Sequence, residues 1–174
     1  MLPVVDIRLI REPDISLVSR YFTKGTNGKH KARFLRQQTG EALYLIGWIG
    51  ERPVSHALLT WGGSKDQAVK RNLSLACPDV GDLMVAEDLR SQGIGSQMLA
   101  FAEQLVRERG YNHIGLSVGI ENERARQLYE RLGYHDAHCG EHIEQWQYLD
   151  AQGQAHTEQE TCIYLIKELQ AADS

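Results

Sequence analysis

A glycine-rich turn ahead of a strongly amphipathic segment carries the clearest chemical signal in this sequence. The turn, Arg90-Ser91-Gln92-Gly93-Ile94-Gly95-Ser96, stands between an apolar strand pattern and a helix pattern. Two glycines let the backbone bend tightly and approach a ligand closely. The first turn of a helix leaves amide N–H groups unpaired at the positive end of the helix dipole. Together these features predict a phosphate or pyrophosphate site, with Arg90 adding positive charge nearby.

Two common nucleotide-binding motifs are disfavoured at this turn. A Rossmann fingerprint needs a third glycine, and Met98 occupies that position. A P-loop needs Gly-Lys followed by Ser or Thr, which the sequence lacks. On these residues alone, a tight packing turn without a ligand is the competing interpretation.

The elements on either side of the turn must position it. Asp79 to Val85 is predicted to be a strand, and Ile94 to Arg109 has apolar residues close to a period of 3.6, which indicates a helix. His113 to Val118 is predicted to be the next strand. A strand, helix and strand in this order form a parallel unit with a crossover connection, nearly always right-handed.

The remaining pattern predicts strands linked by short turns, which are expected to be antiparallel. Helices are predicted from Pro13, over Lys29 to Gln38 and over Asn122 to Leu132, with a break at Thr26-Asn27-Gly28 and an irregular polar loop over Trp61 to Ala76. The other strands are predicted at Val4 to Ile10, Leu43 to Ile49, Val54 to Trp61, and in a final pair, His142 to Leu149 and Thr161 to Ile166, joined by a polar loop. The predicted fold class is therefore α/β, a mixed and mostly antiparallel twisted sheet with helices on both faces and a central parallel βαβ unit.

Composition limits the class of protein. The chain has 174 residues, which predicts a single domain over 1–174. A formal net charge of −4 argues against a nucleic-acid partner. No stretch approaches the roughly 20 apolar residues of a membrane span. Three scattered cysteines and an N-terminus without a signal-peptide pattern favour a cytoplasmic protein with reduced thiols.

The residues around the glycine turn resemble the GNAT superfamily of N-acetyltransferases. The family signature Gln/Arg-x-x-Gly-x-Gly/Ala, at the start of a long helix, is matched at each fixed position by Arg90 to Gly95. A second family block, N-x-x-A-x-x-L-Y-E-x-L-G-F/Y, is matched by Asn122 to Tyr134. Two ordered blocks are far more specific than either alone, and the strong match covers roughly Asp79 to Tyr134.

The resemblance implies an enzyme that transfers the acetyl group of acetyl-CoA to an amine. Backbone amides of Gln92 to Ser96 would hold the CoA pyrophosphate, and the backbone of the preceding strand would pair with the pantetheine arm. Asn122 would contact the cofactor, although Asn is also an ordinary helix N-cap. The implied cofactor-binding residues are Leu83, Met84, Val85, Arg90, Ser91, Gln92, Gly93, Ile94, Gly95, Ser96 and Asn122.

The same resemblance assigns Tyr129 as the general acid that protonates the CoA thiolate when the reaction intermediate collapses. A phenol is a hydrogen-bond donor with a pKa near 10, which suits this role. The alternative is a core tyrosine on the apolar stripe of its helix. No cysteine lies in either block, so direct attack by the amine is expected rather than a covalent acetyl-cysteine route.

An alkylamine with a pKa near 10.4 is neutral in only about one molecule in 2,500 at pH 7, so a base should help. Asp79 is the first candidate, because many family members place an acid there, often Glu. Strand alternation is expected to put Asp79, Leu83 and Val85 on one face and Asp82 on the other. An exposed loop carboxylate is the alternative interpretation of Asp79, and Asp82 and His113 are weaker candidates for the base.

Two other groups of residues invite interpretation. His135, His138, Cys139 and His142 are metal-ligand types, but they lack paired spacing in a segment predicted to be a loop leading into a strand, so no metal is predicted. The basic run from Lys24 to Arg36 is typical of a solvated helix face; a patch that steers anionic CoA, or part of the acceptor site, is the alternative.

The sequence thus predicts an N-acetyltransferase whose acceptor is a small-molecule or peptide amine. The alternative is a non-catalytic CoA-binding sensor or partner subunit on the same fold. A homodimer is possible by analogy with the family.

Overall fold

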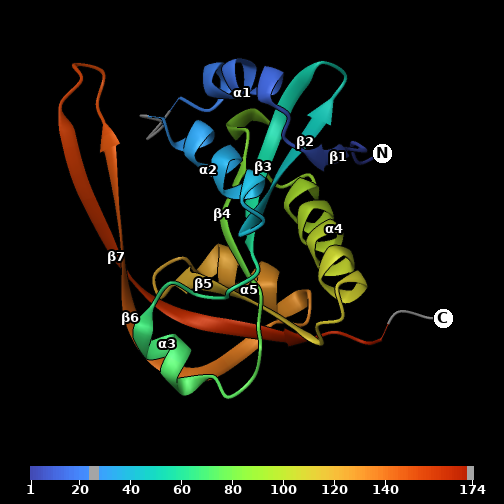
Figure 1. Ribbon diagram of the computed structural model, residues 1–174, viewed down its shortest axis with the longest axis vertical. Coiled ribbons are helices and arrows are strands. Elements are labelled where there is room, and N and C mark those ends of the chain that lie inside the picture. The colour runs from blue at the N-terminus through green and yellow to red at the C-terminus, as the bar shows by residue number, and fades with distance from the viewer. Residues whose placement is uncertain (24–27, 172–174) are drawn as a thin grey trace.

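The computed structural model describes residues 1–23 and 28–171 and contains one seven-stranded sheet in the order β1-β2-β3-β4-β5-β7-β6 (Figure 1). The strands are β1 (Asp6–Leu9), β2 (Ala42–Ile49), β3 (Arg52–Thr60), β4 (Asp79–Val85), β5 (His113–Gly119), β6 (His135–Leu149) and β7 (Ala155–Glu168). The α-helices are α1 (Ile15–Tyr21), α2 (Lys29–Gln38), α3 (Gln67–Asn72), α4 (Ile94–Glu108) and α5 (Glu123–Arg131). Lys24 and the predicted break at Thr26 and Asn27 lie outside the described residues.

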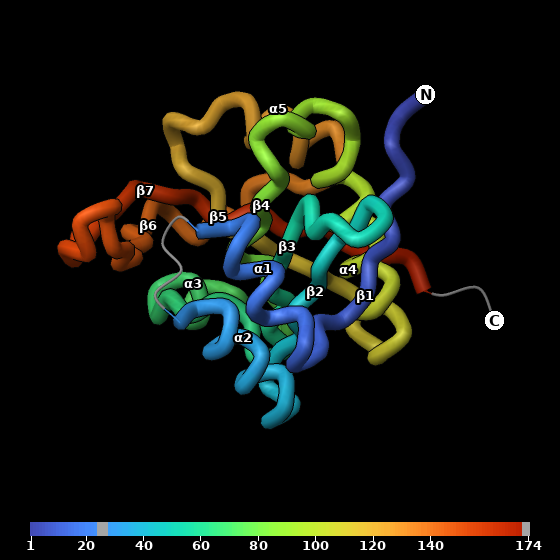
Figure 2. The backbone as a smooth tube through the Cα atoms, turned by 90° about the horizontal axis from the view of Figure 1, so that it is seen from above, coloured from blue at the N-terminus to red at the C-terminus, as the bar shows by residue number. Residues whose placement is uncertain are grey.

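Helices cover both faces of the sheet, as predicted. Neighbouring residues of β2 show this, because Leu45 belongs to an apolar cluster with α4, whereas Tyr44 and Ile46 belong to a second cluster with α1 and α2. Side chains alternate along a strand, so the two clusters lie on opposite faces. Figure 2 views the same arrangement from above.

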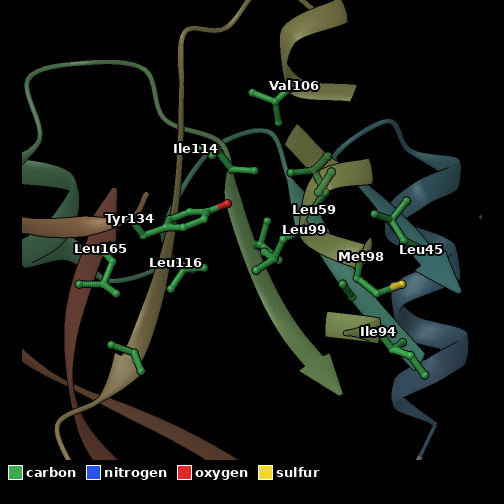
Figure 3. Packing of buried hydrophobic residues seen from close by; sticks show 14 of the residues in the cluster. Leu45, Leu59, Ile94, Met98, Leu99, Val106, Ile114, Leu116, Tyr134 and Leu165 are labelled. Atoms are coloured by element: carbon green, nitrogen blue, oxygen red, sulfur yellow. The ribbon is translucent and has the colours of Figure 1, made fainter. Parts of the chain in front are cut away.

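The larger cluster anchors the helix that begins at the glycine turn. Figure 3 shows Met98 and Leu99 of α4 packed among buried side chains of the sheet, including Leu59 and Ile114. Met98 is fully buried and Leu99 is 1% exposed. Because these side chains repeat at helical spacing, one face of α4 is fixed against the sheet and its first turn is held at the end of β4.

The central parallel pair is much less complete than its neighbours. β4 and β5 share the single register pair Asp79↔Gly115, whereas β5 pairs with β7 from His113↔Glu168 to Gly119↔Cys162. The two strands therefore diverge after Asp79. The backbone of β4 beyond this point has no strand partner on the side of β5, which agrees with the splay implied by the family resemblance.

A bulge in β4 corrects one prediction. The register with β3 passes from Leu58↔Gly81 to His56↔Met84, so β4 has one residue more than β3 in this stretch. Asp82 has φ of 53°, in the left-handed region. The bulge breaks the strand alternation, so Asp79 does not share a face with Leu83 and Val85. Those two side chains pack against the α4 cluster, whereas Asp79 bonds Tyr164, which belongs to a third apolar cluster with Val69 of α3.

The last two strands are longer than predicted. The segment predicted to be a polar loop is mostly strand, because β6 and β7 continue to pair as far as Leu149↔Ala155 before a tight turn at Asp150 to Gln154. The segment predicted to be a loop at His135 to Gly140 is the start of β6, with an irregularity between Asp136 and Glu141. The outer part of this hairpin, residues 143–161, extends away from the sheet (Figure 1), and we call it the arm. The strand over His142 to Leu149 was predicted, whereas the polar side chains of residues 155–160 hid the outer part of β7 from an analysis based on buried apolar residues.

Replacement of Gly115 by Ala should destabilise the protein at the point where β4 and β5 part. A Cβ on Gly115 would lie 2.5 Å from Cε1 and Oη of Tyr164, so that buried ring must move. We expect a loss of about 1–3 kcal/mol in the free energy of unfolding, measured by urea denaturation. Gly62→Ala is the matched control, because no atom lies within 4 Å of the added Cβ. Equal stability of the two variants would contradict this prediction.

Candidate active site

The glycine turn forms a row of unpaired amides at the start of α4. Gly93 is the N-cap residue with φ of 82°, and Ser91 also has a positive φ of 64°. Within the described residues, no hydrogen-bond acceptor is present for the amides from Ser91 to Ser96, whereas Gln97 bonds Gly93 at 3.1 Å. Successive free amides at the positive end of a helix fit a diphosphate, so the residues present suit the pyrophosphate of CoA.

Arg90 ties the turn to the end of β4. Its Nε donates to the carbonyl oxygen of Val85 at 3.2 Å, and its guanidinium also reaches Sδ of Met84 at 3.6 Å. No carboxylate pairs with Arg90 among the described residues. The guanidinium therefore brings an unneutralised positive charge to the point where strand and helix meet.

Two cavities open beside β4. The larger, of about 610 Å³, contains Met84, Val85 and Arg90 of the predicted cofactor residues, and lies below α1 and α2. The smaller, of about 340 Å³, contains Asp79, Asn122 and Tyr129. Both are lined by Asp82, Leu83 and Trp146, so they adjoin at the bulge. Residues from Ser91 to Ser96 line neither cavity and form the separate turn that follows Arg90.

Asp79 lies at the edge where β4 leaves β5. Its carboxylate accepts a hydrogen bond from the hydroxyl of Tyr164 at 3.0 Å. Burial raises the pKa of Asp79 to about 7, and the nearby carboxylates Glu144 and Asp82 add to the rise. The Tyr164 hydrogen bond and the charge of Lys65 act in the opposite direction. Asp79 is thus a half-buried cavity carboxyl and not the exposed loop residue of the alternative interpretation.

Tyr129 faces the same cavity from α5. Burial raises the pKa of its hydroxyl, which keeps the phenol protonated at neutral pH. Its ring packs against the α4 cluster and makes an edge contact with Tyr134 at 6.1 Å between centroids. The hydroxyl has no hydrogen-bond partner within residues 1–23 and 28–171. The ring therefore packs in the core while the hydroxyl remains available as a hydrogen-bond donor. The interpretations as a core tyrosine and as a general acid are compatible.

Asn122 is the N-cap of α5 and also lines a cavity. Its side-chain oxygen accepts from the amide of Ala125 at 3.2 Å, which makes it the N-cap of α5. It also lines the smaller cavity. The side-chain NH₂ group of an N-cap asparagine has no role in the cap, so it is free to bond a ligand.

Other candidate residues lie elsewhere. His113 stands at the first position of β5, opposite Glu168, and lines neither cavity. His135, His138, Cys139 and His142 are distributed along β6. No group of three or more His, Cys, Asp or Glu side chains among the described residues is arranged to hold a metal ion. No helix in the described part of the chain is long and apolar enough to cross a membrane.

The arm supplies cavity residues that the sequence analysis missed. Glu144, Trp146 and Tyr148 of β6 line the cavities, together with Glu158 and Glu160 of β7. These strands pair Glu144↔Glu160 and Trp146↔Glu158, which places all of these side chains on the inner face of the arm. Ile143, Gln145 and Gln147, which alternate with them, carry no charge. The strand over His142 to Leu149 was predicted, and its period of two is the signal that could also have revealed this inner face.

The chain belongs to the acetyltransferase (GNAT) family, whose model matches residues 13–134. Aminoalkylphosphonate N-acetyltransferase of Salmonella typhimurium is 38% identical over 60 residues, which cover 34% of this chain and 39% of that protein. Streptothricin acetyltransferase of Streptomyces lavendulae is 38% identical over 61 residues, covering 35% of this chain and 31% of that protein. The matches thus span less than half the length of either relative.

Solved structures support the same fold over nearly the whole chain. The ribosomal-protein-S18-alanine N-acetyltransferase of Escherichia coli has a TM-score of 0.65 at 18% identity and covers 98% of this chain and 97% of that one. A GNAT family acetyltransferase of Elizabethkingia anophelis, solved with acetyl-CoA bound, has a TM-score of 0.60 at 14% identity. The match covers 95% of this chain and 98% of that one. These comparisons confirm the predicted family and fold class.

The raised pKa of Asp79 predicts how stability changes with pH. Its folded-state pKa of about 7 lies above the ordinary value of 3.8, so the folded protein holds a proton that the unfolded chain has lost. This contribution to stability is therefore present below about pH 4 and is lost as pH rises towards 7. The slope is at most about 1.4 kcal/mol per pH unit. Urea denaturation between pH 4.5 and 7.5 should show this decline in the wild type and not in Asp79→Asn; parallel curves would contradict it.

Proposed function

We propose that this chain is an N-acetyltransferase that moves the acetyl group of acetyl-CoA to a primary amine by direct attack. The observation that carries the proposal is the row of unpaired amides from Ser91 to Ser96, placed at the end of a strand that has parted from its neighbour. The family match and the neighbours solved with acetyl-CoA or CoA support acetyl-CoA as the cosubstrate.

In this proposal the amides at the start of α4 hold the pyrophosphate, and Arg90 adds charge beside them. The free backbone edge of Leu83 to Val85 pairs with the pantetheine arm, because these groups lack a partner on the side of β5. Asn122 reaches the same arm from the opposite wall of the smaller cavity. The cosubstrate supplies the activated acetyl group, and the protein supplies its orientation.

Asp79 acts as the base that accepts the proton of the incoming amine. A carboxyl with a pKa of about 7 is close to the optimum for this task at neutral pH, because it is ionised often enough and still basic enough to take a proton. Its neighbours set this value by burial and by like charge. The shorter reach of Asp, relative to the Glu common in the family, leaves room for one water between the carboxylate and the amine.

Tyr129 acts as the acid that protonates the departing CoA sulfur. Its hydroxyl is protonated at neutral pH and has no partner in the described chain to compete for its hydrogen. Asp79 and Tyr129 line one cavity, so the proton acceptor and the proton donor can serve the same reacting centre.

The acceptor enters between the arm and α1–α2. The inner face of the arm presents Glu144 and Glu160 directly opposite each other, next to the ring of Trp146. An alkylamine arrives as a cation, which these carboxylates and the ring face attract. The proposed acceptor is thus a positively charged primary amine, on a small molecule or a peptide.

The test is an acceptor screen that follows free thiol release from acetyl-CoA, combined with thermal denaturation. Acetyl-CoA at about 100 times its dissociation constant should stabilise the fold by about 2.7 kcal/mol and raise the melting temperature. Stabilisation without thiol release across a broad panel of amines would instead support the non-catalytic CoA-binding alternative. No thermal shift at millimolar acetyl-CoA would contradict both.

Tyr129→Phe separates the acid role from cofactor binding. Loss of the hydroxyl should lower kcat by about 100-fold or more, since general acid catalysis contributes roughly that factor, while CoA binding stays nearly unchanged. Turnover and the dissociation constant of CoA would be measured side by side. The matched control is Tyr134→Phe. Tyr134 packs against the Tyr129 ring, and its hydroxyl donates to Glu103. Unchanged turnover in Tyr129→Phe would remove this residue from the acid role.

A further inference from the structure

The left-handed residue in the middle of β4 requires an explanation beyond the family fold. Asp82 has φ of 53°, in the left-handed region that residues with a side chain seldom adopt, although Asp and Asn adopt it more readily than most. It lies in the bulge, between the register pairs at Gly81 and Met84, and it lines both cavities. Whatever holds Asp82 also sets the course of the strand expected to face the acetyl end of the cosubstrate.

The side chain of Asp82 is held from α2. Nε and a terminal nitrogen of Arg33 both lie 3.1 Å from Oδ2 of Asp82. The Arg33 side chain is only 14% exposed, whereas 48% of the Asp82 side chain is accessible. The guanidinium is therefore a fixed, largely desolvated partner, and the carboxylate is the more accessible member of the pair.

Arg33 is itself held by a chain of hydrogen bonds that leads back to the end of α1. A nitrogen of Arg33 donates to the Tyr44 hydroxyl at 3.2 Å, and that hydroxyl lies 2.7 Å from Nδ1 of His30. Nε2 of His30 lies 2.9 Å from the carbonyl oxygen of Phe22. The carbonyl can only accept, so Nε2 carries the hydrogen, and neutral Nδ1 accepts from Tyr44. Burial lowers the pKa of His30, which favours this neutral form.

The backbone of Asp82 is held separately by β3. His56 and Leu58 pair with Met84 and Gly81 on either side of Asp82, and the Asp82 backbone is near enough to His56 to act on the pKa of its ring. His56 is 5% exposed and stands beside His30 and Tyr44, with ring centroids 5.6 and 5.7 Å away. Burial lowers its pKa well below the ordinary value, so the ring is neutral and brings no charge to oppose Arg33.

We propose that Arg33 is a positioning residue for acetyl transfer, which acts through Asp82 to hold the bulge of β4 in its reactive shape. This role rests on the proposed function, since the bulge matters for catalysis only if acetyl-CoA lies along β4. Arg33 touches neither the reacting atoms nor the diphosphate turn. It fixes the course of the backbone on which the acetyl group is aligned, and it links that backbone to α2, the wall past which the acceptor enters.

This arrangement predicts a particular kinetic signature. The unpaired amides at the start of α4, which would hold the diphosphate, line neither of the cavities at the bulge, so loss of Arg33 should leave most of the cosubstrate affinity intact. Misalignment at the acetyl end should appear in turnover, because small displacements of reacting groups reduce rates by up to about 100-fold. We expect kcat to fall about tenfold and KM for acetyl-CoA to change by less than about twofold.

The experiment is a double-mutant cycle with Arg33→Gln, Asp82→Asn and the double variant. Asn tolerates the left-handed conformation, so Asp82→Asn removes the charge without forcing the backbone to change. Both single variants should lower kcat, and the double variant should be no slower than the slower single one, because the effects pass through one contact. Arg33→Lys should recover part of the loss. Arg20→Gln, an exposed arginine of α1, is the matched control.

A second readout does not depend on activity. Hydrogen exchange of the β4 amides in the free protein should be faster in Arg33→Gln than in Arg20→Gln, with folding verified by circular dichroism. Additive effects on kcat, or a KM increase as large as the loss of kcat, would overturn the positioning role. Unchanged exchange in β4 would overturn it as well. If the wild type fails to bind acetyl-CoA, the proposed function fails, and the exchange result still decides whether Arg33 holds the bulge.

Discussion

The incomplete pairing of β4 with β5 is the constraint on which the rest of this structure depends. A strand in the middle of a sheet normally has all of its backbone groups bonded on both sides, and here the pairing ends after Asp79↔Gly115. The apolar clusters on either side make this possible, because α4 fixes one half of the sheet while β7 continues the other. The opening between the strands is therefore a product of packing at its borders and not of local disorder.

Charges around the opening are separated by element. The arm contributes carboxylates, α2 contributes guanidinium and ammonium groups, and the bulge brings Asp82 between them. Asp79 responds to this distribution, since the like charges of Glu144 and Asp82 help to raise its pKa. A cation bound at this wall would offset part of that repulsion and would make Asp79 easier to ionise. Acceptor binding and activation of the base would then be linked through electrostatics alone.

Much of the fold could be predicted because its main elements follow simple periodicity. The helix from Ile94 and the strand from Asp79 to Val85 have apolar residues that repeat with the period of their secondary structure, and the structure confirms both. The glycine turn was recognisable because only a small set of residues suits a positive φ at the start of a helix, as Gly93 shows. Local residue preferences and global packing agree at these positions.

Two parts were not predicted, for different reasons. The bulge at Asp82, whose carboxylate pairs with Arg33 on a helix distant in sequence, interrupts strand alternation, so that alternation gave the wrong face for Asp79. The arm consists of polar strands that satisfy their backbones through each other, and Trp146 shows no apolar neighbours in sequence that would mark it as a cavity residue. The bulge thus depends on a contact between segments distant in sequence, whereas the arm is a local hairpin whose outer β7 strand was missed because its side chains are polar.

The arm also limits how this sequence can change. Its glutamates lie on the inner face together with Trp146 and Tyr148, because side chains alternate along the paired strands of the arm. Insertion of one residue into one strand between the sheet and the turn would rotate every later side chain of that strand by half a turn, which would move Trp146 or Glu158 to the outer face, away from the opening. Insertions of two residues would preserve the faces and only lengthen the projection. Among descendants of this protein, arms of different length should therefore differ by even numbers of residues per strand.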